Sequence, residues 1–482
     1  MRRTTPPPKR TRWFRLAAVL LAISPFVAGE LYLRATQTVD SSDLADDPIL
    51  DSSRLTPLFE PSADGKRWEI PDSRRNFFQP ASFPIQKPAD TRRVFVLGGS
   101  TVQGRPYATE TAFAKWMELR LQTADLDHHY EVVNCGGVSY ASYRVARILG
   151  EVLQHAPDAI VIYTGHNEFL EERSYATLSK PPSWFSRMGN QLRLVAAIRQ
   201  TLRGRPDTED LPQEVSTRLD QPGGLELYVR DEAWRRAVVE HFAINLRRMV
   251  QACQAAGVPL YLCVPTSDCV NTPPIKIQSL PPGEIDRQRF DQAWSRACDG
   301  ESTDAARLAA CKECLAIDPH HAGAHYIAGK LHWDRGNSSL AAEHLIAARD
   351  DDVCPLRATT PILQQVEQLG DQPGLTLIRC DHLFDRSDAA GRPLPDGLAD
   401  PSQFVDHVHP TVNGHQEIGE QLATAFARDF GIAMTEKAMA RYREQAERHL
   451  ATLDETYYAR GKQRLEGLRQ WASGRAGELS LD

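Results

Sequence analysis

The sequence predicts an α/β fold built around a parallel β-sheet, with a helical unit inserted and a membrane anchor in front. Three observations support this prediction. From residue 92 onward, short apolar runs alternate with stretches of helical periodicity, which is typical of successive βαβ units. Residues 303–350 have a pattern of paired helices instead, and the chain opens with basic residues followed by an apolar run.

Length and composition set the first limits. The chain has 482 residues, which is too long for one ordinary domain. Its 41% hydrophobic and 25% charged residues are typical of a globular protein. The net charge of −7 argues against nucleic acid as a main partner, because phosphate contacts need a clustered basic surface.

The N-terminal segment, residues 1–33, is predicted to be a cytoplasmic basic tail and a transmembrane anchor. Basic residues precede the apolar run 16–29, which extends to Leu33 if Glu30 lies near the outer interface. Small residues at 27–29 also permit a cleaved signal peptide, but the strong basic cap favours the uncleaved anchor. In both cases the rest of the chain is expected outside the cytoplasm.

Residues 34–91 are polar and contain prolines, with no sustained period. We predict a juxtamembrane stalk here that packs onto the following domain near residues 77–88. The sheet domain itself is predicted to occupy residues 92–290 and 356–434.

Five apolar runs are the predicted strands, and helical stretches lie between them. The strands are expected at residues 94–97, 131–134, 159–163, 260–264 and 375–379, and examples of the helices at 111–123, 143–155 and 231–256. Loop signals in residues 173–230 indicate an insertion over one end of the sheet. No residue of this insertion indicates a catalytic role.

Residues 291–355 form the predicted helical insertion and resemble tetratricopeptide repeats, which stack helical hairpins at a 34-residue period. In that register Cys311 and Cys314 lie on the packing face of a helix. We therefore interpret this Cys-x-x-Cys pair as core residues rather than a zinc or redox motif. The nine cysteines of an exported chain permit disulfides, but their spacing identifies no pairs. One and a half repeats are too few to bury a core of their own, and the unit must therefore pack on the main domain.

Residues 435–482 are predicted to form one long C-terminal helix with an apolar stripe. The stripe could dock on the body of the protein or on a partner, and docking on the body is favoured.

Polar side chains follow the predicted strands at the carboxyl edge of the sheet, where sites in parallel α/β folds form. Ser100 follows the first strand, a loop of small residues at 134–143 follows the second, and Asn167 follows the third. Asp406 and His409 lie in a turn beyond the last strand. Together they supply a nucleophile, oxyanion donors and an acid–base pair.

The chemistry explains why these residue types are needed. A serine hydroxyl is a weak nucleophile unless a histidine takes its proton, and a carboxylate must hold that histidine in the correct tautomer. Asp406 and His409 are close enough in sequence for this contact within one turn. The oxyanion of an acyl-transfer intermediate also needs preorganised donors, which a backbone N–H of the small-residue loop and the amide of Asn167 could supply.

Four motifs, VLGGST, VVNCGGVSYAS, YTGHNEF and DHVHP, resemble blocks I, II, III and V of the SGNH (GDSL-type) hydrolase superfamily. Together with the segment VPTSDCVNTPPIK, they most resemble a membrane-anchored subgroup with a tetratricopeptide insertion. The resemblance implies a three-layer, flavodoxin-like fold and reaction at ester bonds without a cofactor.

The same resemblance implies a role for each matching residue. Ser100 matches the nucleophile, Asp406 and His409 the rest of the triad, and Asn167 an oxyanion donor. In block II the donor glycine of the family falls near Ser139 in this chain, and Gly136 or Gly137 could serve instead in a shifted register. Gly99 stands where the family has the acid of its GDS motif, which is not a triad member.

Neighbouring polar residues are given structural interpretations. His166 is expected to make a local hydrogen bond, Glu168 to anchor its loop, and His407 to point away from the Asp406–His409 pair. The spacing of these histidines and His415 matches no compact zinc motif, so no metal is expected.

These observations lead to three functional hypotheses. The first is an extracytoplasmic serine esterase acting on O-acyl, in particular acetyl, esters. The second is an O-acyltransferase that uses the same triad on a carbohydrate. The third is a non-enzymatic scaffold that binds a protein partner through the helical insertion. The expected partners are an ester-bearing substrate, for which an acylated carbohydrate is one candidate, and the membrane, with no nucleic acid. A protein partner that binds the helical insertion is a further candidate.

Overall fold

A computed structural model describes residues 54–175, 209–280, 283–384 and 397–473 of the chain. It also describes residues 21, 24–29, 44, 47, 49–52, 394 and 395. The statements below about the structure concern these residues.

The central sheet has five parallel strands in the order β10-β9-β7-β5-β6. They are β5 (Thr91–Gly98), β6 (His129–Gly136), β7 (Ala159–Tyr163), β9 (Leu260–Val264) and β10 (Leu375–Arg379). Each contains one of the five predicted apolar runs, so the predicted strands are confirmed. Numbered along the chain, the order is 2-1-3-4-5 read from β6, which is the flavodoxin-like order that the resemblance implied.

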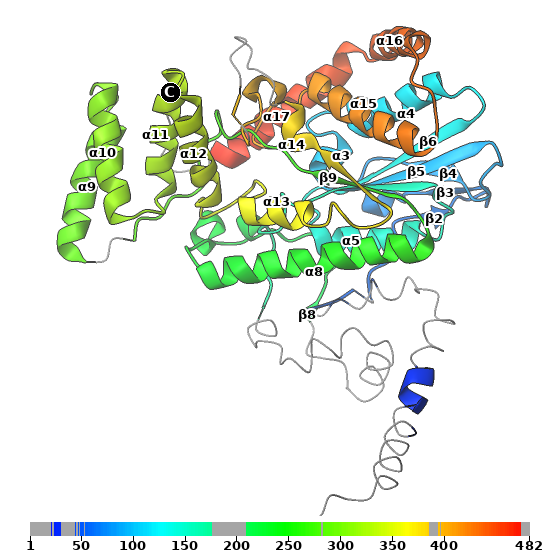
Figure 1. Cartoon of the computed structure of the whole chain (residues 1–482), viewed down its shortest axis with the longest axis horizontal. Coiled ribbons are helices and arrows are strands. Elements are labelled where there is room, and N and C mark those ends of the chain that lie inside the picture. The colour runs from blue at the N-terminus through cyan, green and yellow to red at the C-terminus, as the bar shows by residue number, and fades with distance from the viewer. Residues whose placement is uncertain are drawn as a thin grey trace, which may run out of the picture.

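Helices cover both faces of the sheet (Figure 1). On one face lie α5 (Ser142–Val152), α8 (Glu232–Ala256) and α13 (Thr360–Glu367), and on the other α4 (Phe113–Ala124) and α15 (Val412–Asp429). The inner strands β7 and β9 are continuously apolar because both of their faces are buried, as is typical of parallel strands. The three layers explain the alternation of apolar runs and helical stretches in the sequence.

Local sequence signals set the ends of these helices. The carboxylate of Asp231 accepts hydrogen bonds from the N–H groups of Ala233 and Trp234 at the start of α8. Gly257, with φ of 66°, ends that helix in the left-handed conformation that glycine tolerates. Thr411 caps the start of α15 as Asp231 caps α8, because its hydroxyl oxygen accepts a hydrogen bond from the N–H of Gly414. This cap fixes where the chain leaves the turn that contains His409.

Residues 58–84 belong to the folded domain, which corrects the predicted stalk. They form a small antiparallel sheet of β2 (Glu60–Pro61), β3 (Arg67–Glu69) and β4 (Ser82–Pro84). Five apolar side chains of this region are buried in the main core, namely Leu58, Phe59, Ile70, Phe78 and Phe83. Phe78 and Phe83 lie in the part of the segment that was predicted to pack onto the domain. The strands themselves were not predicted, because they have only two or three residues each, too few to show a period.

The inserted unit consists of four helices beside the main body (Figure 1). They are α9 (Glu284–Cys298), α10 (Asp304–Ile317), α11 (Ala322–Asp334) and α12 (Ser338–Asp350). Cys311 and Cys314 are buried between these helices, as the repeat register predicted. The unit is attached to the main body in part by Tyr326, whose hydroxyl donates to the carbonyl of Val270. The name tetratricopeptide repeat stays a prediction, and none of the nine cysteines forms a disulfide.

The C-terminal region has two helices where the sequence predicted one. α16 (Glu436–Ala451) ends at Thr452, and α17 (Glu455–Ser473) begins after Asp454, whose carboxylate accepts from the N–H of Tyr457. This local cap competes with continued helix and produces the break. α16 packs on α4 through a cluster that includes Trp116 and Tyr442, so its apolar stripe docks on the body.

Among the described residues no helix has the length and apolarity needed to cross a membrane. Most of the predicted anchor, residues 1–33, lies outside the described part of the chain. The anchor therefore stays a prediction.

The remaining elements are short. They are β1 (Leu50–Asp51), β8 (Glu209–Asp210), α3 (Ser100–Gln103), α14 (Cys380–Leu383) and five 3-10 helices, η1 (Asp72–Arg74), η2 (Thr109–Thr111), η3 (Arg218–Asp220), η4 (Gly224–Leu227) and η5 (Pro401–Gln403).

The crossing of α15 over α4 depends on Gly419. A methyl group there would lie 2.6 Å from the carbonyl oxygen of Phe113 and 2.6 Å from Cβ of Trp116. We expect Gly419→Ala to lower the free energy of unfolding by about 1–3 kcal/mol through overpacking, more than the ~1 kcal/mol that alanine gains in a helix. Urea unfolding monitored by circular dichroism measures the change. Gly467→Ala is the control, because a methyl group on this helical glycine would meet no atom within 4 Å. An unchanged or higher urea midpoint for Gly419→Ala would contradict the packing argument.

Candidate active site

Ser100 lies at the carboxyl edge of the sheet because two glycines allow close packing there. β5 ends at Gly98, and Ser100 is the first residue of α3. A methyl group on Gly98 would lie 2.0 Å from the carbonyl oxygen of Tyr163, and one on Gly99 would lie 2.4 Å from Nδ2 of Asn167. Side chains at either position would therefore push Ser100 away from the neighbouring strand and its loop.

Ser100, His409 and Asp406 form a continuous hydrogen-bonded chain. Nε2 of His409 lies 2.8 Å from Oγ of Ser100, and Nδ1 of His409 lies 2.7 Å from Oδ2 of Asp406. The fold thus brings together residues 309 positions apart in the sequence. A further contact joins the two segments, because the hydroxyl of Thr101 donates to the carbonyl of Val408 at 3.3 Å.

The turn of residues 405–409 holds the Asp406 carboxylate against the His409 ring. Oδ1 of Asp406 accepts from the N–H groups of Val408 and His409, at 3.0 and 2.9 Å. Burial alone would raise the pKa of Asp406, but His409, His407 and these hydrogen bonds outweigh burial and hold that pKa below its usual value. The carboxylate is therefore ionised at neutral pH, as a group that orients a histidine must be.

Ser139 and Asn167 lie in the wall of the cavity that contains Ser100. Ser139 has a φ of 61°, a conformation that suits the glycine of the family motif. The N–H groups of Gly136 and Gly137 donate to Asn134 and Gly98, so neither of these alternative donors is free. In the described part of the chain, the N–H of Ser139 has no acceptor.

Asn167 donates one of its two amide N–H groups to the carbonyl of Tyr140 at 3.0 Å. The carboxamide is thereby oriented while its second N–H stays available to a ligand. Sequence reasoning missed a third donor: the backbone N–H of Ser100 also lacks an acceptor within the described residues. Its position in the first turn of α3, where backbone N–H groups have no partner within the helix, is the signal that could have found it.

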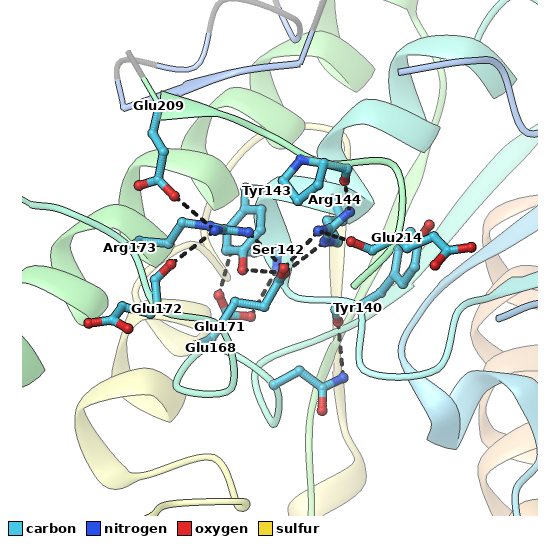
Figure 2. A network of polar contacts seen from close by, with 12 residues as sticks. Tyr140, Ser142, Tyr143, Arg144, Glu168, Glu171, Glu172, Arg173, Glu209 and Glu214 are labelled. Carbon is cyan, nitrogen blue, oxygen red and sulfur yellow. Dashed lines mark hydrogen bonds and ion pairs between the residues drawn. The ribbon is translucent and has the colours of Figure 1, made fainter. Parts of the chain in front are cut away.

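Glu168 ties the loop of Ser139 to the loop of Asn167, as predicted (Figure 2). Its carboxylate accepts from the backbone N–H and the hydroxyl of Ser142, at 3.0 and 2.8 Å. Glu168 is 3% exposed, and burial raises its pKa to about 7 although the hydrogen bonds from Ser142 oppose that rise.

A buried ion pair also joins α5, the helix that follows the loop of Ser139, to the loop of Asn167. Nε and Nη2 of Arg144 each lie 2.7 Å from the carboxylate of Glu171, and both side chains are 1% exposed. Arg173 and the hydroxyl of Tyr143 also donate to Glu171 (Figure 2). Although burial alone would raise the pKa of Glu171, Arg144 and Arg173 keep it below its usual value. Removing one partner would leave an unpaired buried charge, so this network holds the loops in one arrangement.

Three other histidines lie near the triad. His166 makes a hydrogen bond that is not the expected local one, because its Nδ1 accepts from the N–H of Ala358, 192 positions further along the chain, at 3.1 Å. His407 corrects a prediction, because it lines the same cavity as Ser100 and its Nδ1 lies 3.6 Å from Asp406. His415 is buried in α15 and stacks against Phe113. Burial lowers the pKa of His407 to about 4 and those of His166 and His415 to about 3, so all three are neutral.

The cavity over Ser100 has a volume of about 370 Å³, and part of its wall comes from segments that sequence reasoning did not assign to the site. Thr217 and Asp220 come from the 173–230 insertion, in which the sequence indicated no chemistry. Arg464 and Leu468 come from α17. Residues 176–208 of the insertion lie outside the described part of the chain.

In the described ranges no three His, Cys, Asp or Glu side chains converge in a way that could hold a metal ion.

Comparison with known proteins gives few matches. No family model matches the chain, and no curated protein matches it in sequence. Solved structures that match it include a lipolytic protein of the G-D-S-L family from Desulfitobacterium hafniense, with 10% identity over 69% of this chain and 98% of that chain and a TM-score of 0.29. A catalytic mutant of an acetylxylan esterase from Geobacillus stearothermophilus matches with 14% identity, 73% and 98% coverage and a TM-score of 0.32. A GDSL-like lipase from Bacteroides thetaiotaomicron matches with 10% identity, 70% and 89% coverage and a TM-score of 0.28. Because these TM-scores are low, membership of the SGNH superfamily stays a prediction from the motifs.

The raised pKa of Glu168 predicts a pH-dependent stability. Because its folded pKa lies above the usual value of 4.5, Glu168 favours the folded state most below pH 4.5, and this contribution declines as the pH rises to about 7. Glu168→Gln removes the titration but can keep both contacts with Ser142. We expect the unfolding free energy of wild type minus that of the variant to fall by roughly 3 kcal/mol between pH 4.5 and pH 8. Urea unfolding of both proteins at these two pH values measures it, and a difference that does not change with pH would contradict the prediction.

Proposed function

We propose that this protein is a serine esterase of SGNH type that acts on O-acyl esters through Ser100, His409 and Asp406. One observation carries the proposal: Oγ of Ser100 lies 2.8 Å from Nε2 of a histidine whose other ring nitrogen is held by a carboxylate. This is the arrangement that converts a serine hydroxyl into a nucleophile.

In the first half of the reaction Ser100 Oγ attacks the acyl carbonyl carbon, and Nε2 of His409 takes the hydroxyl proton. Asp406 keeps Nδ1–H of His409 in place and stabilises the imidazolium that forms. The carbonyl oxygen becomes an oxyanion, for which the N–H groups of Ser100, Ser139 and Asn167 are the available donors. Collapse of the intermediate breaks the ester C–O bond, and His409 gives its proton to the leaving alcohol.

In the second half water replaces the alcohol. His409 takes a proton from the water as its oxygen attacks the acyl-serine, and a second tetrahedral intermediate forms at the same donors. When this intermediate collapses, the acid leaves and the proton returns from His409 to Ser100 Oγ. An alcohol of a carbohydrate could take the place of this water, which is the transferase alternative.

Location and partners belong to the same proposal. We place the catalytic domain outside the cytoplasm because the basic segment and the apolar run at the start of the sequence favour that orientation. A scaffold that binds through α9–α12 is the alternative without catalysis. It is the weaker of the two, because a scaffold gives no reason for a complete Ser–His–Asp chain in an open cavity.

The nucleophile is tested with a fluorophosphonate probe and a generic acetyl ester. We expect wild type to be labelled at Ser100 and to hydrolyse the ester, and Ser100→Ala to lose labelling and at least 10³-fold in kcat. Ser339→Ala is the matched control, since Ser339 is an exposed serine on α12, remote in sequence from the triad. A folded wild-type protein that is neither labelled nor active would contradict the esterase and favour the scaffold.

Hydrolysis and transfer are separated by supplying an acceptor. Because water is the proposed acceptor, we expect the purified protein to release equal acetate from the acetyl ester with and without a soluble oligosaccharide. Acetate release and acetylated oligosaccharide are measured together, the latter by mass spectrometry. Acetyl groups on the oligosaccharide, with a matching fall in free acetate, would show a transferase and contradict the hydrolase.

A further inference from the structure

Two arginine side chains line the cavity that contains Ser100. Arg105 follows α3, shortly after Ser100 itself, and Arg464 comes from α17. Neither belongs to the triad or to the oxyanion donors. A cavity of this size that binds only a neutral acetyl ester would not need two guanidinium groups in its wall.

Arg105 is held in position by a neutral group. Its Nε donates to Oε1 of Gln103 at 2.9 Å, and Gln103 in turn donates to the carbonyl of Phe77. No acceptor among the described residues takes a hydrogen bond from Nη1 or Nη2 of Arg105. These two nitrogens are therefore available to a ligand while the side chain is already oriented.

Arg464 is oriented in the same way. Its Nη1 donates to the carbonyls of Pro106 and Tyr107, at 3.3 and 2.8 Å, which fixes α17 against the segment after α3. The other nitrogens of Arg464 have no acceptor in the described part of the chain. Backbone carbonyls hold the guanidinium without neutralising its charge.

The two charges are close enough to affect one another and are not compensated by an acid. Burial and the neighbouring Arg464 both lower the pKa of Arg105. Within the described residues neither arginine forms an ion pair. Asp220, which also lines the cavity, accepts a hydrogen bond from the hydroxyl of Thr217 at 2.6 Å. In a chain with a net charge of −7, two cations that lack an ion pair within the described residues and line the cavity of Ser100 need an explanation.

We propose that Arg105 and Arg464 form a subsite for a negatively charged group of the substrate, so that the preferred esters are anionic. This inference rests on the proposed esterase function and names its substrate class. Guanidinium groups bind carboxylates and other oxyanions through paired N–H donors, and desolvation in a half-closed cavity strengthens that contact. The subsite would hold the charged part of the substrate while the ester carbonyl lies at Ser100 Oγ.

The test compares two acetyl esters that differ in one charge. 4-Acetoxybenzoate carries a carboxylate, and methyl 4-acetoxybenzoate is its neutral counterpart. Acetate release gives kcat/KM for each, normalised to the hydroxide-catalysed rate of the same ester so that leaving-group reactivity cancels. We expect the full-length wild type to prefer the anionic ester at least tenfold.

The variants are Arg105→Gln and Arg464→Gln, with Arg105→Lys and Arg464→Lys to retain the charge. We expect each glutamine variant to reduce the ratio of the normalised kcat/KM values, anionic over neutral ester, to near one. Each lysine variant should retain part of the wild-type preference. Arg460→Gln is the control, because Arg460 is an exposed arginine of α17 outside the cavity. It should keep the preference of wild type, and circular dichroism checks that all variants are folded.

The outcomes separate the two proposals. Equal normalised rates, or cleavage of neither ester by a protein that fluorophosphonate labels at Ser100, would overturn the anion subsite alone. A preference that survives in both glutamine variants would overturn it as well. Absence of labelling at Ser100 would overturn the esterase function and the subsite together.

Discussion

The structure of the site depends on one close approach, that of the backbone of Gly98 to the carbonyl of Tyr163. Gly98 ends β5 and pairs with Tyr163 on one side and with Gly136 on the other. A side chain at this position would collide with the neighbouring strand. Because the three strands end in register, the segments that follow them leave the sheet together and place Ser100, Ser139 and Asn167 around one cavity.

Behind these loops, buried charge replaces apolar packing. Glu168 and Glu171 join the loop after β7 to the start of α5, where Glu171 pairs with Arg144, and all three charged side chains are almost fully buried. Such a network contributes little net stability, because the desolvation of each charge offsets the attraction between them. Its effect is instead on geometry, since the loops cannot separate without exposing an unpaired charge. That rigidity suits donors that must be in place before an oxyanion forms.

Much of the fold followed from the sequence, and the reason is visible in particular elements. The strands at 94–97 and 159–163 are buried on both faces, so each is a run of consecutive apolar residues that is easily recognised in the sequence. The Asp406–His409 turn is equally local, because the carboxylate, the imidazole and the backbone donors lie within four residues. The sequence motif therefore predicted a contact that the structure contains.

Other features depend on contacts that no local pattern records. The strands β2–β4 are too short to show a period, and their burial comes from a core assembled by distant segments. The break between α16 and α17 lies in the cap at Asp454, inside an otherwise continuous helical pattern. Thr217 and Arg464 enter the cavity wall through packing across more than a hundred residues, and only the three-dimensional arrangement shows it.

The long separation between Ser100 and its histidine has a consequence for the growing chain. A ribosome synthesises the strand that ends at Gly98 long before it reaches His409, 309 residues after Ser100, and Arg464 follows later still. In the proposed reaction, Ser100 therefore has no general base until the segment that contains His409 has been synthesised. A shorter nascent chain would carry Ser100 as an ordinary, unactivated alcohol.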